Sequence, residues 1–278
     1  MLENTFCHVP GIGPSVERKL WSAGVRSWQE AQCAESLPLS ARKAQTLLDH
    51  LAASATHLAD NNPHYFYDLL PSREHWRMFP QFAHTTAYLD IETTGLGTPD
   101  DIVTTIVLYD GRTIRHYVRD ENLMDFRDDV ADYQLLVTYN GKTFDVPFLR
   151  NLLGVAMNHA HIDLRYVLAS LGYRGGLKAC EERLGLGRTD LADVDGAFAV
   201  LLWWDYRNNA NPKALETLLA YNALDVVSLA TLMPMAYNMK LKATPFSDSH
   251  RLAVPQPPPV PFKPDLRTIQ RIRREHGW

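Results

Sequence analysis

Cysteine is scarce in this chain, and neither sign of charge dominates it. The 278 residues include three cysteines, Cys7, Cys33 and Cys180, which stand far apart and show no Cys-x-x-Cys spacing. This pattern excludes a disulfide framework and argues against a zinc knuckle. The formal net charge of -4 excludes a strongly basic nucleic-acid-binding coat, but it leaves room for a local basic groove.

Long apolar runs are missing as well. Residues 1–10 contain Glu3 and lack the apolar segment of a signal peptide. No uninterrupted run of about 18 apolar residues occurs, so we expect no membrane span. The chain is nevertheless 46% hydrophobic, which is enough apolar material for a sizeable core. We therefore expect a reduced, cytoplasmic, globular protein of one large or two modest domains.

Composition and charge divide the chain into four parts. Residues 1–60 are rich in alanine and leucine and predict a small all-α module, and residues 61–83 form an aromatic-rich connector. Residues 84–242 hold 15 basic and 21 acidic residues and are expected to form the main domain. Residues 243–278 hold six basic and three acidic residues and predict a Pro-rich extended linker with a basic tail.

The main domain begins with strands and continues with alternating helices and strands. Three β-rich runs come first, at 86–91, 102–109 and 113–119, the last two joined by an Asp-Gly turn. The later segments alternate between the two periodicities: helix 122–132, strand 135–139, helix 144–153, a short strand at 162–163, and helices to residue 240. This order predicts an α/β fold, with a mixed β-sheet flanked by helices behind the small N-terminal all-α module.

Four acidic residues in this domain stand where their carboxylates can converge. Asp90 and Glu92 alternate on the first strand and therefore share one face. Asp145 follows the strand at 135–139, and Asp225 lies four residues after Tyr221 in an apolar helix. Oxygen ligands of this kind suit Mg²⁺ or Mn²⁺. Two such ions about 4 Å apart can activate water and stabilise the leaving oxygen in phosphodiester hydrolysis.

Each acid also has an ordinary structural explanation when it is taken singly. Asp90 and Glu92 could lie on a solvent-exposed edge strand, Asp145 could cap a helix, and Asp225 could be a surface acid. The apolar residues around Asp90 and Asp225 favour the convergent interpretation, because a buried carboxylate is costly unless it is paired or binds a metal.

Three motifs in the main domain resemble those of a known family. Asp90–Leu96 (Asp-Ile-Glu-Thr-Thr-Gly-Leu) looks like the first motif of the DnaQ-like 3′–5′ exonucleases, which have a ribonuclease H-like fold. Asn140–Asp145 (Asn-Gly-Lys-Thr-Phe-Asp) is similar to the second motif, and Tyr221–Asp225 resembles the third in its DEDDy form. The resemblance spans residues 84–240 and is strongest to little-characterised bacterial ribonuclease H-like exonuclease-domain proteins.

The resemblance implies a catalytic set. Asp90, Glu92, Asp145 and Asp225 would hold two divalent metal ions, Mg²⁺ or Mn²⁺. Tyr221 would position the attacking water.

It also implies contacts with the substrate. Thr93 and Leu96 would bind the terminal nucleotide, and Phe144 would lie beside it. Asn140 would orient the pocket or contact the substrate, although it could equally cap the following helix. Asp163 would support the site from behind.

The N-terminal module contains a turn similar to that of a helix-hairpin-helix. In such a turn the backbone N–H groups near Gly11 and Gly13 meet a phosphate, and Ser15, Arg18 and Lys19 are suited to phosphate contact as well. A plain helical hairpin or a protein-binding one is the alternative. Residues 1–83 carry seven basic and eight acidic residues, so any affinity for DNA would be modest and sensitive to salt.

Together these features predict a metal-dependent 3′–5′ exonuclease that acts on nucleic acid, with DNA favoured over RNA, and releases nucleoside 5′-monophosphates. Two alternatives remain open: a non-catalytic module that binds nucleic acid or protein on the same fold, and a structure-specific endonuclease that uses the same site. The tail could bind a protein partner or nucleic acid, or it could be a linker that ends in a solvent-exposed helix.

Overall fold

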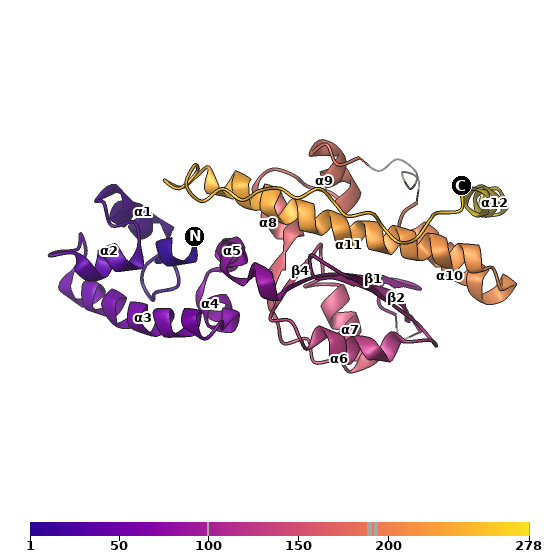
Figure 1. Cartoon of the computed structure of the whole chain (residues 1–278), viewed down its shortest axis with the longest axis horizontal. Helices are drawn as coiled ribbons and strands as arrows, with labels where there is room; N and C mark the ends of the chain where they lie inside the picture. The colour runs from indigo at the N-terminus through magenta and orange to yellow at the C-terminus, as the bar shows by residue number, and fades with distance from the viewer. Residues whose placement is uncertain (99, 188–190, 192–193, 278) are drawn as a thin grey trace.

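The computed structural model describes residues 1–98, 100–187, 191 and 194–277. The N-terminal helices lie at one end of an elongated molecule, and a five-stranded sheet occupies the middle (Figure 1). The last helix of the chain lies at the opposite end, so the two termini are far apart along the long axis.

The N-terminal part is helical, as expected. Its helices are α1 (Pro14–Ser22), α2 (Trp28–Cys33), α3 (Ala41–Ala59), α4 (Pro63–Leu69) and α5 (Phe79–Phe82), with short 3-10 turns at Leu2–Asn4, Ser72–Met78 and Ala83–Thr85. The break after α3 has a local cause, because the Asn62 side chain accepts hydrogen bonds from the first turn of α4 and Pro63 occupies the first helical position.

The sheet is mixed, and this confirms the expected α/β fold. Its strands are β1 (Thr86–Thr93), β2 (Val103–Tyr109), β3 (Ile114–Val118), β4 (Leu135–Thr138) and β5 (Ala160–Asp163), in the order β3-β2-β1-β4-β5. β1 pairs antiparallel with β2 and parallel with β4, and β5 continues the parallel side. β1 is therefore the central strand, and residues on it cannot lie on an exposed sheet edge.

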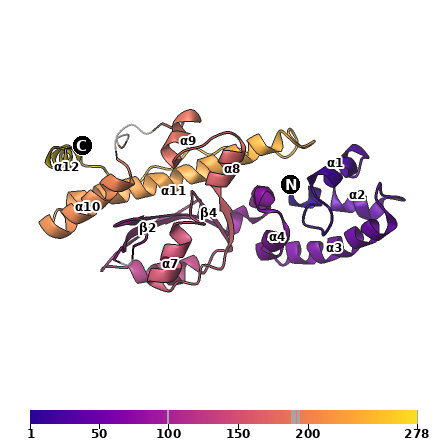
Figure 2. The same cartoon turned by 180° about the vertical axis from the view of Figure 1, so that it is seen from behind.

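Helices cover both faces of the sheet (Figures 1 and 2). On one face lie the 3-10 turn Leu123–Asp125, α6 (Phe126–Val130) and α7 (Asp145–Leu153). On the other face lies α11 (Pro212–Leu241), which packs against β1, β2 and β4 and against its neighbour α10 (Gly196–Asn209). Two shorter helices, α8 (Leu164–Ser170) and α9 (Leu177–Arg183), pack beside α11.

Helix α11 is long and largely apolar, a feature that the absence of an uninterrupted apolar run did not predict. By length and composition it is apolar enough to cross a membrane, although no uninterrupted apolar run of that size exists in the sequence. In the fold, 83% of its apolar window is buried. This is the behaviour of a core helix that touches protein on most of its circumference.

The tail is docked rather than loosely attached. Its extended part runs along α11, where Asn238 exchanges two hydrogen bonds of 2.8 and 2.9 Å with the backbone of Leu252. The final helix, α12 (Leu266–His276), buries Ile269 and Ile272 against α10 and α11. The expected solvent-exposed helix is thus amphipathic and half covered, because its isoleucines recur at helical spacing.

Two buried histidines predict acid sensitivity. His8 bonds to Ser54 at 2.8 Å and His161 bonds to Thr138 at 2.8 Å, and burial lowers the pKa of each imidazole to about 3. The unfolded chain takes up protons near pH 6.5, whereas the folded chain does not until about pH 3. Stability is therefore complete above pH 6.5 and is lost as the pH falls, by up to about 1.4 kcal/mol per pH unit for each histidine.

Urea unfolding between pH 7 and pH 4 measures this loss. His8→Gln should flatten the pH dependence, whereas the same change at exposed His84 should not. An equal slope in all three proteins would contradict the assignment to His8.

Candidate active site

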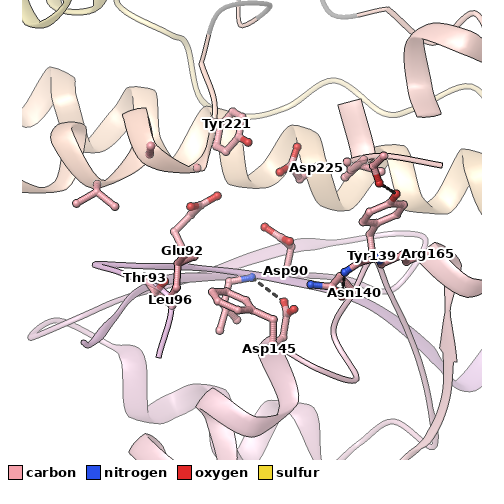
Figure 3. A pocket seen from close by; sticks show the side chains of 18 of the residues that line it. Asp90, Glu92, Thr93, Leu96, Tyr139, Asn140, Asp145, Arg165, Tyr221 and Asp225 are labelled. Carbon is pink, nitrogen blue, oxygen red and sulfur yellow. Dashed lines mark hydrogen bonds between the residues drawn. The ribbon is translucent and has the colours of Figure 1, made fainter. Parts of the chain in front are cut away.

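A cleft of about 850 Å³ opens beside the sheet, where β1 ends and β4 leads into α7. Its lining includes every residue of the predicted catalytic set: Asp90, Glu92, Asp145, Tyr221 and Asp225. These side chains come from the central strand, from the start of α7 and from α11, and they face one another across the cleft (Figure 3).

Three of the carboxylates form a compact cluster. Asp90, Glu92 and Asp225 each offer an oxygen atom, and the three atoms lie within 4.8 Å of one another. The alternation along β1 places the first two on one face, and α11 crosses above them with Asp225. Glu92 and Asp225 are both buried, so neither is the edge-strand or surface acid that the sequence alone allowed.

Asp145 approaches this cluster from the other side of β1, and it is not one of the three acids whose oxygen atoms lie within 4.8 Å of one another. It is the first residue of α7, it is only 3% exposed, and its Oδ1 accepts a hydrogen bond of 3.2 Å from the Ile91 backbone N–H. Ile91 lies between Asp90 and Glu92 on the strand. The fourth carboxylate is therefore fixed to the strand that carries the first two.

The crowding of acids changes their protonation. The pKa of Asp90 is raised well above its ordinary value, first by burial and then by Asp225, Asp145 and Glu92. The pKa of Asp145 is raised to about 7, mainly by burial. Like charges that share a desolvated site disfavour the ionised forms. An all-carboxylate donor set of this kind fits a hard divalent cation, because such an ion offsets the repulsion.

The sequence analysis missed Asn222, which orients one of the acids. Its Nδ2 donates to Asp90 Oδ2 at 2.6 Å, and its Oδ1 accepts from the Thr105 hydroxyl at 3.1 Å. Asn222 is fully buried. The available signal was a single amide within the apolar run of α11, because a buried amide requires partners for both of its ends.

Asp163 lies behind the loop that leads to α7. Its carboxylate accepts backbone N–H groups from Asn140 (2.8 Å), Lys142 (3.1 Å) and Arg165 (3.0 Å). Burial raises its pKa, and these backbone donors oppose the rise. At Gly141 the loop passes so close to Thr138 that an added Cβ would collide with the threonine side chain. The loop of the second motif, Asn140–Asp145, is thus fixed through its backbone, by the hydrogen bonds to Asp163 and by the close approach to Thr138.

Asn140 does not cap α7. It adopts a left-handed conformation (φ 70°), and its Oδ1 accepts from the Thr143 hydroxyl at 2.7 Å and from Arg165 Nη1 at 2.5 Å. Phe144 stands at the cap position of α7 and makes no side-chain capping bond. The alternative role that the sequence allowed for Asn140 is therefore absent from the fold.

The residues expected to contact substrate all line the cleft: Thr93, Leu96, Asn140 and Phe144. Leu96 is 90% exposed, the highest exposed fraction among the large hydrophobic side chains that the structure describes. The Thr93 hydroxyl donates to the Gly95 carbonyl at 2.6 Å and so shapes the turn that presents Leu96. The ring of Phe144 packs against Phe148 with centroids 4.8 Å apart.

The N-terminal hairpin residues are divided between two surfaces. Ser15, Arg18 and Lys19 line an open hollow along α1. Gly11 and Gly13 line a neighbouring hollow, together with Asp68 of α4. The structure does not gather all five predicted phosphate-binding residues into one pocket, and the neighbouring carboxylate makes the glycine hollow less favourable for an anion.

The fold and the acidic cleft agree with the comparisons to known proteins. The sequence profile of the RNase_H superfamily matches residues 87–237, which is more than half of the chain, so the chain belongs to the RNase_H superfamily. This membership indicates a nuclease that acts on a nucleic acid. The fold usually binds divalent metal ions, and the carboxylate cluster is compatible with that.

Particular relatives are more distant. The chain is 30% identical over 172 residues to the uncharacterised protein YprB of Bacillus subtilis (strain 168), a match that covers 52% of this chain and 40% of the relative. The chain therefore matches less than half the length of that relative. It is also similar to the family B DNA polymerase of the hyperthermophilic archaeon Pyrobaculum calidifontis, with 16% identity and a TM-score of 0.35, over 56% of this chain and 29% of the polymerase.

Proposed function

We propose that the protein is a metal-dependent 3′–5′ exonuclease of the DEDDy type. It would release nucleoside 5′-monophosphates from nucleic acid, with DNA as the favoured substrate. The observation that carries the proposal is the cluster of Asp90, Glu92 and Asp225 oxygens within 4.8 Å, beside Asp145 and Tyr221 in one cleft.

Each residue has a stated task in this proposal. Asp90, Glu92 and Asp225 would hold one divalent ion, Mg²⁺ or Mn²⁺, and Asp145 would help to hold a second. When bound, two such ions activate water and stabilise the leaving oxygen of a phosphodiester. Asn222 keeps the Asp90 carboxylate turned toward the cleft through its 2.6 Å hydrogen bond.

The shape of the cleft favours a strand end. The turn at Thr93–Gly95 presents the exposed Leu96 side chain at one end of the cleft, and the Phe144 ring lines the same cleft. A terminal base can pack on these apolar groups, since stacking and apolar contact tolerate any base. This arrangement supports exonuclease over endonuclease action.

Labelled oligonucleotides distinguish the candidate activities. A single-stranded DNA carrying a 3′ or a 5′ label is incubated with Mg²⁺ or Mn²⁺. Release of the 3′ label as a mononucleotide, with a ladder of shortening 5′-labelled products, is expected. Internal cuts would favour the endonuclease. An absence of cleavage with either ion, while DNA binding persists, would favour the non-catalytic module.

Tyr221→Phe should slow turnover more than it weakens binding. The substitution removes one hydroxyl from the cleft and keeps the ring that packs in α11. If the hydroxyl positions water, kcat should fall on the order of 10²-fold while KM changes little. Single-turnover kinetics measure the step directly. Tyr206→Phe is the control, because that hydroxyl bonds to Glu121 outside the cleft. An unchanged rate would remove Tyr221 from the mechanism.

The N-terminal module is proposed to hold duplex DNA through Arg18 and Lys19. Both are exposed on α1, and reversing both charges should weaken duplex binding and reduce the dependence of log Kd on log salt by about 2. Reversal of Arg42 and Lys43, exposed on α3, is the matched control. Equal binding by both variants would favour a purely structural hairpin.

A further inference from the structure

The cleft extends well beyond the carboxylate cluster. Figure 3 shows Leu96 and Glu92 toward one side, Asp90 and Asp145 in the middle, and Tyr139, Asn140 and Arg165 toward the other side. Arg174, from the segment between α8 and α9, also lines the cleft. The side opposite Leu96 is therefore polar and cationic.

Arg165 is held in place without being neutralised. Its Nη1 donates to Asn140 Oδ1 at 2.5 Å, and the partner is a neutral amide. Within residues 1–98, 100–187, 191 and 194–277, no carboxylate forms an ion pair with Arg165 or Arg174. A guanidinium that is oriented by an amide keeps its full positive charge and its remaining N–H donors.

The acid two residues before Arg165 already has hydrogen-bond partners. Asp163 accepts three backbone N–H groups, one of them from Arg165 itself, so its oxygens are directed to the loop backbone. The adjoining wall is also fixed, because the Tyr139 hydroxyl donates to the Gly175 carbonyl at 2.5 Å, next to Arg174. The cationic end is thus shaped before any ligand binds, which reduces the entropic cost of binding.

A guanidinium of this kind is suited to a phosphodiester. Its planar fork matches two phosphate oxygens, and charge-assisted hydrogen bonds of this type are among the stronger ones. In the proposed exonuclease, the linkage that breaks lies at the acids and the terminal base lies at Leu96. The strand must then continue toward Arg165, where the next phosphodiester arrives.

We propose, on the basis of the function above, that Arg165 binds the phosphodiester one nucleotide upstream of the scissile linkage. Arg165 is then a positioning residue that fixes the direction of the strand. The terminal base would contact the apolar Leu96 side chain, and the upstream phosphodiester would contact Arg165. The scissile linkage at the 3′ end would then lie between these two contacts. The site would recognise the backbone and not the base sequence.

A neutral linkage tests the contact. Two DNA oligonucleotides are compared, one natural and one with a methylphosphonate at the linkage upstream of the scissile one. For the wild-type protein, the methylphosphonate should lower kcat/KM about 10- to 100-fold, because it removes the charge that Arg165 binds. Arg165→Gln should lower kcat/KM on natural DNA by a similar factor, mainly through KM, and should no longer distinguish the two oligonucleotides.

Two further variants show whether the loss of discrimination is specific to Arg165. Arg112→Gln removes an exposed positive charge beyond β2 and should retain the wild-type ratio between the two oligonucleotides. Arg165→Lys should retain part of the ratio. If Arg165→Gln keeps the full ratio, or if the wild type does not distinguish the oligonucleotides, the proposal is wrong.

The proposed function is tested separately with the p-nitrophenyl ester of thymidine 5′-monophosphate, which has no upstream linkage. The wild type could hydrolyse this ester while Arg165→Gln keeps the wild-type ratio of kcat/KM between the natural and the methylphosphonate oligonucleotides. That result would leave the exonuclease proposal standing and overturn only the Arg165 contact. Failure to hydrolyse both the ester and natural DNA would overturn the function itself.

Discussion

Asp90→Asn should reduce cleavage of DNA on the order of 10³-fold or more. The substitution keeps the size of the side chain and removes the negative charge of one of the three carboxylates whose oxygens lie within 4.8 Å of one another. It also replaces the acceptor of the Asn222 hydrogen bond by an amide. The loss should appear in kcat, because the carboxylate acts on the reacting linkage.

The stability of the same variant should change in the opposite direction. Burial and three neighbouring acids raise the pKa of Asp90, so the cluster costs the metal-free fold free energy at neutral pH. Asp90→Asn should therefore melt at a higher temperature than the wild type without divalent ions, and Mg²⁺ or Mn²⁺ should raise its melting temperature less. Asp128→Asn, at an exposed position of α6, is the control for both measurements. Cleavage within a few-fold of the wild-type rate would contradict the catalytic role of Asp90.

Arg77→Met should destabilise the protein by about 3–5 kcal/mol. The Arg77 guanidinium is buried and lies 2.8 Å from both Glu17 and Glu74, and it also donates to the Thr5 hydroxyl at 2.8 Å. Removal of the arginine leaves the buried Glu17 carboxylate without its cation and leaves Glu74 with only the long ionic contact to Arg73. Glu17 belongs to α1 and Arg77 to the connector, so the loss would weaken the junction between the N-terminal helices and the connector.

Urea unfolding monitored by circular dichroism measures this effect. Arg73→Met is the matched control, because the Arg73 side chain is 67% exposed and its contact with Glu74 is 3.7 Å long; it should cost less than about 1 kcal/mol. Replacing Glu17 and Glu74 by glutamine in the Arg77→Met background should recover part of the loss, since it removes the uncompensated charges. A loss below 1 kcal/mol for Arg77→Met alone would contradict the argument.

Local patterns in the sequence predicted most of the elements. The small all-α module predicted for residues 1–60 contains the long helix α3, Ala41–Ala59, and the turn at Asp110-Gly111 joins β2 and β3 as expected. The predicted helix at 122–132 is instead a 3-10 turn followed by the five-residue α6. Its polar residues stabilise no regular helix on their own, so packing of Phe126 and Val130 decides how much forms.

Contacts between distant parts of the chain were harder to predict. The alternation of Asp90 and Glu92 is local and readable, but Asn222 bonds to a residue 132 positions away. The periodicity of apolar residues along a helix or strand does not predict a hydrogen bond between two side chains that lie so far apart in the sequence. The docked tail is similar, because a run of prolines indicates an extended backbone without indicating the surface that it follows.

Helix α11 contributes both to the cleft and to the surface on which the tail docks. One side of it supplies Tyr221 and Asp225 to the cleft and Asn222 to the Asp90 carboxylate, and an adjacent side anchors the tail through Thr217, Thr231 and Asn238. A chain cut before Leu252 would expose the tail-binding side to water and leave the same helix to support the acids unaided. Limited proteolysis of the tail should therefore alter the cleft. A fusion partner is better placed after residue 277 than in place of the tail.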